Sequence, residues 1–167
     1  MTNLQMLVRQ HQDKAALLAS QSADWSQRKA KWLSVLQQLT GQIRTLLIAA
    51  GVPEQHIVTT QHHITEGTLG SYEAQGLQVH IGAATVQFVP IASTIIGGCG
   101  RVDVTGPRGE VKLIADDGQL LDTPQNTAPA HQHEWVWSVY PDKSRRSGFR
   151  LDEDGLAQLL GLVLGHA

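Results

Sequence analysis

Apolar residues in the first fifty positions recur at steps of three, four and seven, which places them along one stripe of an α-helix. The pattern is clear from Trp25 to Ala50 and weaker before Ser20, where the polar residues His11 and Ser22 fall on the stripe. The apolar members of this stripe are Leu4, Val8, Ala15, Leu18, Trp25, Trp32, Leu36, Leu39, Ile43, Leu46 and Ala50.

Glycine and proline divide the chain at residue 51. Residues 1–50 contain Gly41 and no proline, whereas residues 51–167 contain the other 15 glycines and all six prolines. Helix interiors disfavour both residues and tight turns require them, so the first segment predicts helix and the second predicts short strands joined by turns. Gly51 followed by Pro53 is also the expected end of a helix.

The first fifty residues form either one helix or a hairpin of two helices. Ser22 as an N-cap and Asp24 in a first turn would start a second helix. The stripe nevertheless keeps its register through residues 20–24, which favours one continuous helix. Both arrangements remain open at this point.

The length of a continuous helix exceeds the size of the body that could cover it. A helix over residues 4–50 is about 70 Å long, while a compact body made from residues 51–167 is roughly 35 Å across. We therefore expect residues 25–50 to pack on the body. Residues 1–22 are left to fold back or to pair with another chain.

Beyond residue 51, short segments of alternating or β-branched residues predict strands. Gly82-Ala83 and Pro107-Arg108 sit between such segments and suit two-residue hairpin turns. Hairpin-length connections predict antiparallel pairing of neighbours. The predicted strands are residues 56–65, 77–81, 86–88, 95–104 with a glycine-rich interruption, 110–114, 134–140 and 149–151.

The chain closes with a short amphipathic helix. Asp152, Glu153 and Asp154 lie where a helix start favours negative charge. Its apolar face consists of Leu156, Leu159, Leu160, Val163 and Leu164. The predicted fold is α+β: a long N-terminal helix or helix hairpin (1–50), then an antiparallel β-meander of six to seven strands and a C-terminal helix (51–167), in one compact domain.

Composition describes an ordinary folded protein, with 41% hydrophobic and 17% charged residues. One cysteine excludes an intramolecular disulfide, and neither a secretory signal nor a membrane-spanning run is evident, so we expect a cytoplasmic protein. Residues 1–50 carry a net charge of +4 and residues 51–167 carry −6. This asymmetry indicates a basic helix lying on an acidic body; a basic arm for nucleic acid or membrane is the alternative, which the spread of the charges along many helical turns disfavours.

The sharpest candidate for chemistry is the group Asp103, Glu110 and Lys112. A hairpin turning at Pro107-Arg108 places Asp103 opposite Lys112, with Glu110 on the same face. An acid followed on the next strand by Glu-x-Lys resembles the core of the PD-(D/E)xK nucleases. That resemblance implies carboxylates that hold Mg²⁺ and a lysine that assists the attacking water. The competing interpretation is a solvated sheet face with a cross-strand ion pair.

Two other groups carry weaker signals. His131 and His133 flank Gln132 and are candidates for a metal site, which needs three or four ligands. Cys99 lies in a Gly97–Gly100 run, a setting that could expose backbone amides, but we expect the glycines to make a bulge or to let another backbone approach closely, and the cysteine to be buried.

We predict a non-enzymatic binding or accessory protein of adaptor, chaperone or toxin-neutralising type, without a cofactor. It acts through protein–protein contacts of the N-terminal helix, which we expect to form a homodimer of coiled-coil type. The predicted contact residues are Leu4, Val8, Leu18, Trp25 and Trp32. A metal-dependent nuclease or hydrolase on Asp103, Glu110 and Lys112 is the alternative from another class.

Overall fold

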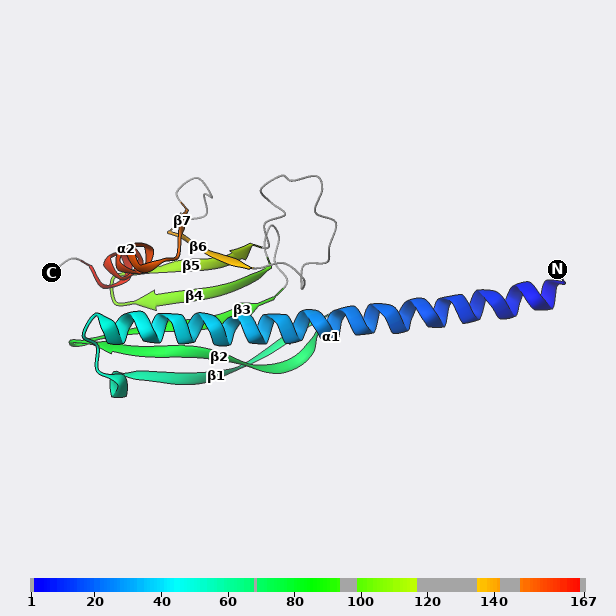
Figure 1. Cartoon of the computed structure of the whole chain (residues 1–167), viewed down its shortest axis with the longest axis horizontal. Coiled ribbons are helices and arrows are strands. Elements are labelled where there is room, and N and C mark those ends of the chain that lie inside the picture. Colours follow the sequence, from blue (N-terminus) through cyan, green and yellow to red (C-terminus); the bar gives the residue numbers. More distant parts are fainter. Residues whose placement is uncertain (1, 68, 94–98, 117–134, 142–147, 166–167) are drawn as a thin grey trace.

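The described residues form a seven-stranded antiparallel sheet, with one α-helix before it and one after it in the sequence (Figure 1). The computed structural model describes residues 2–67, 69–93, 99–116, 135–141 and 148–165, apart from the side chains of residues 18 and 20–24. Its elements are α1 (Asn3–Ala49), the 3₁₀ turn η1 (Glu54–His56), β1 (Ile57–Glu66), β2 (Gly70–Ile81), β3 (Ala84–Ala92), β4 (Gly100–Gly106), β5 (Gly109–Asp116), β6 (Val136–Tyr140), β7 (Phe149–Arg150) and α2 (Glu153–Leu164).

Helix α1 is one continuous helix of 47 residues, so the hairpin alternative does not form. At 1.5 Å per residue it is about 70 Å long. A capping box closes its N-terminus: the Thr2 hydroxyl accepts from the Gln5 amide at 3.2 Å, and the Gln5 side chain accepts from the Thr2 amide at 3.0 Å. The helix ends at Ala49, shortly before Gly51 and Pro53 as predicted.

The sheet is a meander in which each strand pairs with the next along the chain. The predicted turn at Gly82-Ala83 is confirmed, and Gly82 has a φ of 60°, which a two-residue hairpin turn requires at that position. The second predicted turn, at Pro107-Arg108, is also present, and it sets Asp103 directly opposite Lys112. Two-residue turns fix the strand register, and the pattern of local pairing follows from them.

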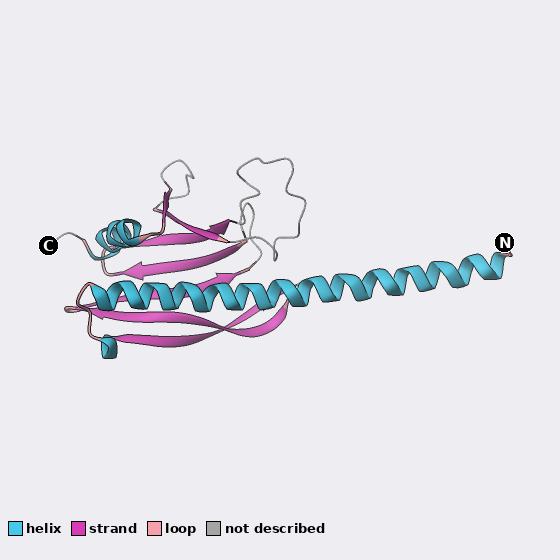
Figure 2. Cartoon of the chain, in the orientation of Figure 1, coloured by secondary structure: helices cyan, strands magenta, loops and turns pink. Residues whose placement is uncertain are grey.

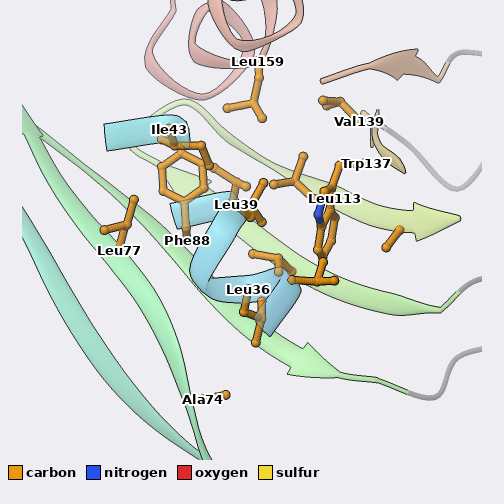
Figure 3. Packing of buried hydrophobic residues seen from close by; sticks show 14 of the residues in the cluster. Leu36, Leu39, Ile43, Ala74, Leu77, Phe88, Leu113, Trp137, Val139 and Leu159 are labelled. Atoms are coloured by element: carbon orange, nitrogen blue, oxygen red, sulfur yellow. The ribbon is translucent and has the colours of Figure 1, made fainter. Parts of the chain in front are cut away.

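The sheet curls around the C-terminal half of α1, and both helices pack against its concave face (Figures 1 and 3). In Figure 3 the α1 residues Leu36, Leu39 and Ile43 lie between Leu77 and Phe88 on one side and β5–β6 on the other. Leu159 of α2 completes the enclosure. The core therefore surrounds one half of a single long helix.

The N-terminal half of α1 extends beyond the end of the sheet (Figure 2). Arg28 and Lys29 are half-buried, and Trp32 is the first fully buried side chain along the helix. At the other end of the chain, Asp152 caps α2 by accepting from the Gly155 amide at 2.7 Å, as its acidic start predicted.

Candidate protein-binding site

Residues 3–27 of α1, here called the projecting segment, lie outside the body, and every described side chain among them is exposed. The exposure includes large apolar groups: Leu4 is 70% exposed, Leu7 52% and Leu17 59%. Val8 is exposed as well. This concentration of exposed apolar side chains on one helix makes the projecting segment the candidate interaction surface.

The exposed and buried halves of α1 share one stripe. A step of seven residues leads from Trp25 to Trp32, and a further seven leads to Leu39. Trp25 is 37% exposed, whereas Trp32 is completely buried and Leu39 is buried beside it. Residues seven apart lie on nearly the same side of a helix. At Trp25, the side of α1 that faces the sheet in the body therefore continues onto the projecting segment.

Of the predicted contact residues, Leu4, Val8 and Trp25 lie on the projecting segment and are exposed. Leu18 lies on the same segment, but its side chain is outside the described part of the structure. Trp32 is in the core, with ring centroids of Trp135 and Trp137 at 6.3 Å and 6.2 Å. It supports the body and is not part of the exposed surface.

The projecting segment carries no net charge, because Arg9 and Lys14 are balanced by Asp13 and Asp24. The basic excess of the N-terminal fifty residues therefore belongs to the half of α1 that lies on the body. An uncharged segment offers little attraction to the phosphates of nucleic acid.

The basic side chains of the covered half are engaged with the body. Arg44 donates to the Ile57 carbonyl at 3.2 Å and to the Thr59 hydroxyl at 2.9 Å. The Lys29 ammonium lies 5.9 Å from the centroid of the Tyr72 ring. These contacts hold the basic half of the helix on the body through neutral groups.

A polar network fixes α1 where it leaves the sheet. The Trp32 indole donates to the Tyr72 hydroxyl at 3.0 Å, and that hydroxyl donates to the Glu66 carboxylate. Glu66 also accepts from the amide of Ser93 at 3.0 Å and from its hydroxyl. The Ser93 carbonyl in turn accepts from Arg28 of α1 at 3.0 Å. The network links α1 to β1, β2 and the end of β3.

Burial raises the pKa of the Tyr72 hydroxyl, and its hydrogen bond to the negatively charged Glu66 raises the pKa further. Tyr72 therefore keeps its proton and remains the donor to Glu66. Because charged hydrogen bonds in a partly buried site are strong, the network gives the helix a defined exit direction.

A small cavity of about 170 Å³ lies between α1 and β6. Its lining residues are Lys31, Val35, Gln38, Leu39, Gln42, Trp135 and Trp137. Ligand pockets commonly measure about 300–1,000 Å³. This cavity has room for ordered water or one small group, and it gives no argument for a larger ligand.

Asp103, Glu110 and Lys112 lie on the sheet face opposite the helices, because they alternate with the buried Val102, Val104 and Val111. The expected ion pair between Asp103 and Lys112 does not form. Both Asp103 oxygens instead accept from Arg101, at 2.7 and 2.9 Å. Two residues on one strand point to the same face, and the planar guanidinium matches a carboxylate in bidentate fashion.

The hydrogen bonds to Asp103 raise the pKa of the Arg101 guanidinium, and the nearby charge of Glu110 adds to this effect. A metal ion at Asp103 would have to compete with this bidentate partner. Among the described residues, no group of three or more His, Cys, Asp or Glu side chains is placed to hold a metal ion. The other metal candidates, His131 and His133, lie outside the described residues.

The glycine run before β4 has a packing role at Gly100. A Cβ added there would lie 2.3 Å from the Trp32 ring, so the indole rests directly on the strand backbone. Cys99 is buried, as expected. We expected a bulge or the approach of another backbone at these glycines; at Gly100 the approaching group is instead the Trp32 side chain, and Gly97 and Gly98 lie outside the described residues.

The network of Glu66, Tyr72 and Ser93 was not found from the sequence. Its members are separated from each other and from α1 by several to 65 residues, so no spacing rule relates them. The only local signal is an acid near a hairpin turn, Glu66, close to the tyrosine that follows the turn.

Comparisons of the chain with protein-family models, with curated proteins and with solved structures gave no significant match. None of the helices among the described residues combines the length and the apolar character needed to cross a membrane.

Proposed function

We propose that this protein is a non-enzymatic binding protein that acts through protein–protein contacts of the projecting segment, and that self-association is part of this activity. The observation that carries the proposal is the exposure of Leu4, Leu7 and Val8 on the stripe side of a helix that leaves the body. Most helical stability in proteins comes from packing of an apolar face. No described part of this chain covers the face, and the proposal assigns that role to a second chain.

The N-terminal cap supports the same proposal. Thr2 and Gln5 close the helix about 40 Å from the first buried turn, judged by the rise per residue. An end that only frayed in solvent would gain little from a capping box. A defined helix end fits a segment that is presented to a partner in helical form.

The test compares one substitution on the stripe with one on the opposite side of the same helix. Leu7→Lys places a charge among the exposed apolar residues, whereas Ala16→Lys places the same charge about half a turn away from the stripe. Both positions are exposed, and all three residue types are good helix formers. The helix itself is therefore preserved in both variants.

Light scattering or sedimentation over a range of concentrations gives the molar mass of each protein. We expect an assembly larger than one chain for the wild type and for Ala16→Lys, and a monomer for Leu7→Lys at the same concentration. Monomeric wild-type protein at high concentration would contradict self-association through the projecting segment. Equal loss of assembly in both variants would contradict the assignment of the contact to the stripe.

A further inference from the structure

We infer that the occupant of the projecting segment is the projecting segment of a second copy of this chain, packed antiparallel, with the two bodies at opposite ends of the assembly. This inference rests on the proposed function and adds the identity and the direction of the partner. It follows from where the sheet lies on α1, from the charge of the segment and from its length.

The position of the sheet decides the direction. Trp32 and Leu39 face the sheet, and Trp25, seven residues before Trp32, lies on the same side of α1 just beyond the sheet's end. A partner helix on this side of the projecting segment occupies the space that the sheet occupies further along (Figure 1). The partner therefore has to end where the sheet begins.

A parallel pair does not meet this condition. Each chain's own sheet would lie between the two helices from residue 28 onward. Paired helices lie about 8–10 Å apart, whereas two sheets between two helices need about 30 Å at roughly 10 Å per packed layer. Parallel helices would have to separate sharply at residue 28, and α1 runs on as one helix through that point (Figure 2).

An antiparallel pair lets the partner helix end where the sheet begins. In this pair, two residues face each other when their numbers sum to about 29. Leu4 of one chain then lies against Trp25 of its partner, and Leu7 lies against position 22. The partner's helix, which begins after its Thr2 cap, starts at the end of the sheet. The partner's helix then covers the exposed half of the stripe, just as the sheet covers the buried half.

The charge of the segment favours a second copy over a charged partner. Arg9, Asp13, Lys14 and Asp24 sum to zero, so two copies do not repel each other and neither attracts a strongly basic or acidic protein. A parallel pair would also place His11 of one chain on His11 of the other, in the middle of the stripe. The antiparallel pair separates these two titratable groups.

The available area is close to what a dimer requires. A helix of 25 residues is about 37 Å long, and the half of its cylinder that faces a partner offers roughly 600 Å². Stable interfaces bury about 800 Å² on each partner. The lower end of the range for such interfaces is about 600 Å² on each partner.

Small-angle X-ray scattering on the unmodified protein, with its mass from light scattering, tests the direction. Two helices of about 70 Å that overlap over 25 residues give a maximum dimension of about 105 Å, and a parallel pair gives about 70 Å. A dimer of about 105 Å supports the inference. A dimer of about 70 Å overturns the antiparallel arrangement and leaves the proposed self-association intact. A monomer overturns both.

Spin labels give an independent reading in a Cys99→Ala background. Label pairs at Asn3→Cys should be about 35 Å apart in the antiparallel dimer and about 10 Å apart in a parallel one. Gln12→Cys is the matched control, because its labels lie within roughly 15 Å in either arrangement. Short distances at both positions overturn the inference, whereas a short distance at residue 12 with a long one at residue 3 supports it.

Discussion

The two halves of α1 have the same helical geometry and the same seven-residue repeat of apolar positions, and they differ in what covers them. From Trp32 to Leu47 the stripe lies on the concave face of the sheet, where its side chains are buried except for the half-buried Leu46. From Leu4 to Trp25 the described side chains of the stripe are exposed. The comparison shows that an apolar pattern encodes the need for a cover, and that the described part of the chain covers only half of this helix.

The largest test of this contrast uses its two tryptophans. Trp32→Ala should destabilise the fold by about 3–5 kcal/mol, which is the usual cost of truncating a buried tryptophan. The substitution also removes the ring that packs against Trp135 and Trp137. Trp25→Ala should change the stability of the body by less than about 0.5 kcal/mol but weaken association. Urea unfolding of both variants, at a concentration where the protein is monomeric, measures the difference. Equal costs would contradict the distinction between the two halves.

A smaller effect is expected where the covered half touches the sheet backbone. Gly100→Ala places a methyl group 2.3 Å from the Trp32 ring, which its neighbours hold in place. Overpacking of this kind costs about 1–3 kcal/mol. Thermal or urea unfolding gives the value, and a Trp32→Leu background should reduce the penalty because the smaller side chain leaves room. A penalty that is unchanged in that background would place the strain elsewhere.

At the junction of the two halves, the stabilising contribution of Tyr72 should decrease at high pH. Tyr72→Phe removes a hydrogen bond to Glu66 and one from Trp32, and should cost about 0.5–1.5 kcal/mol at pH 8. The folded-state pKa of Tyr72 is raised above the unfolded value of about 10. Its contribution is therefore complete below pH 10 and is lost as the pH rises above 10. Denaturant unfolding of both proteins from pH 8 to 11 gives the difference between their free energies of unfolding. This difference should become smaller as the pH rises, and a constant or growing difference would contradict the network.

The smallest change in stability is expected on the solvent-facing side of the half of α1 that packs on the sheet. Gly41 lies within α1, is exposed, and has no atom within 4 Å of the position that a Cβ would take. Gly41→Ala should therefore stabilise the fold by about 0.5–1 kcal/mol through helix propensity alone. Urea unfolding measures the gain, and the solution mass should not change. A loss of stability would show that this side of α1 is covered in the assembled protein.

Most of the fold was predictable because its signals are local. Gly82 and Pro107 mark two-residue turns between alternating segments, and such turns also determine which residues face each other, as the pair Asp103–Lys112 shows. The sequence did not decide between one helix and two, because Ser22 and Asp24 are good residues for the start of a second helix. The stripe's unbroken register proved to be the better guide.

The partners of polar side chains were less predictable than the strand register. Asp103 binds Arg101 on its own strand and not Lys112 across from it, a choice between two neighbours that register alone does not decide. The network of Glu66, Tyr72 and Ser93 depends on how the curled sheet brings distant strands to one point on α1. These residues meet only in the folded protein, and no spacing in the sequence predicts their contact.

The position of α1 before every strand has a kinetic consequence. A ribosome that adds about 5–20 residues per second needs on the order of 5–20 s to make the stretch from β1 to β7. Until the later strands are made, the stripe, including Trp32 and Leu39, has no complete sheet to cover it. The proposed pairing of projecting segments could therefore begin on neighbouring nascent chains, in competition with docking of each helix on its own sheet.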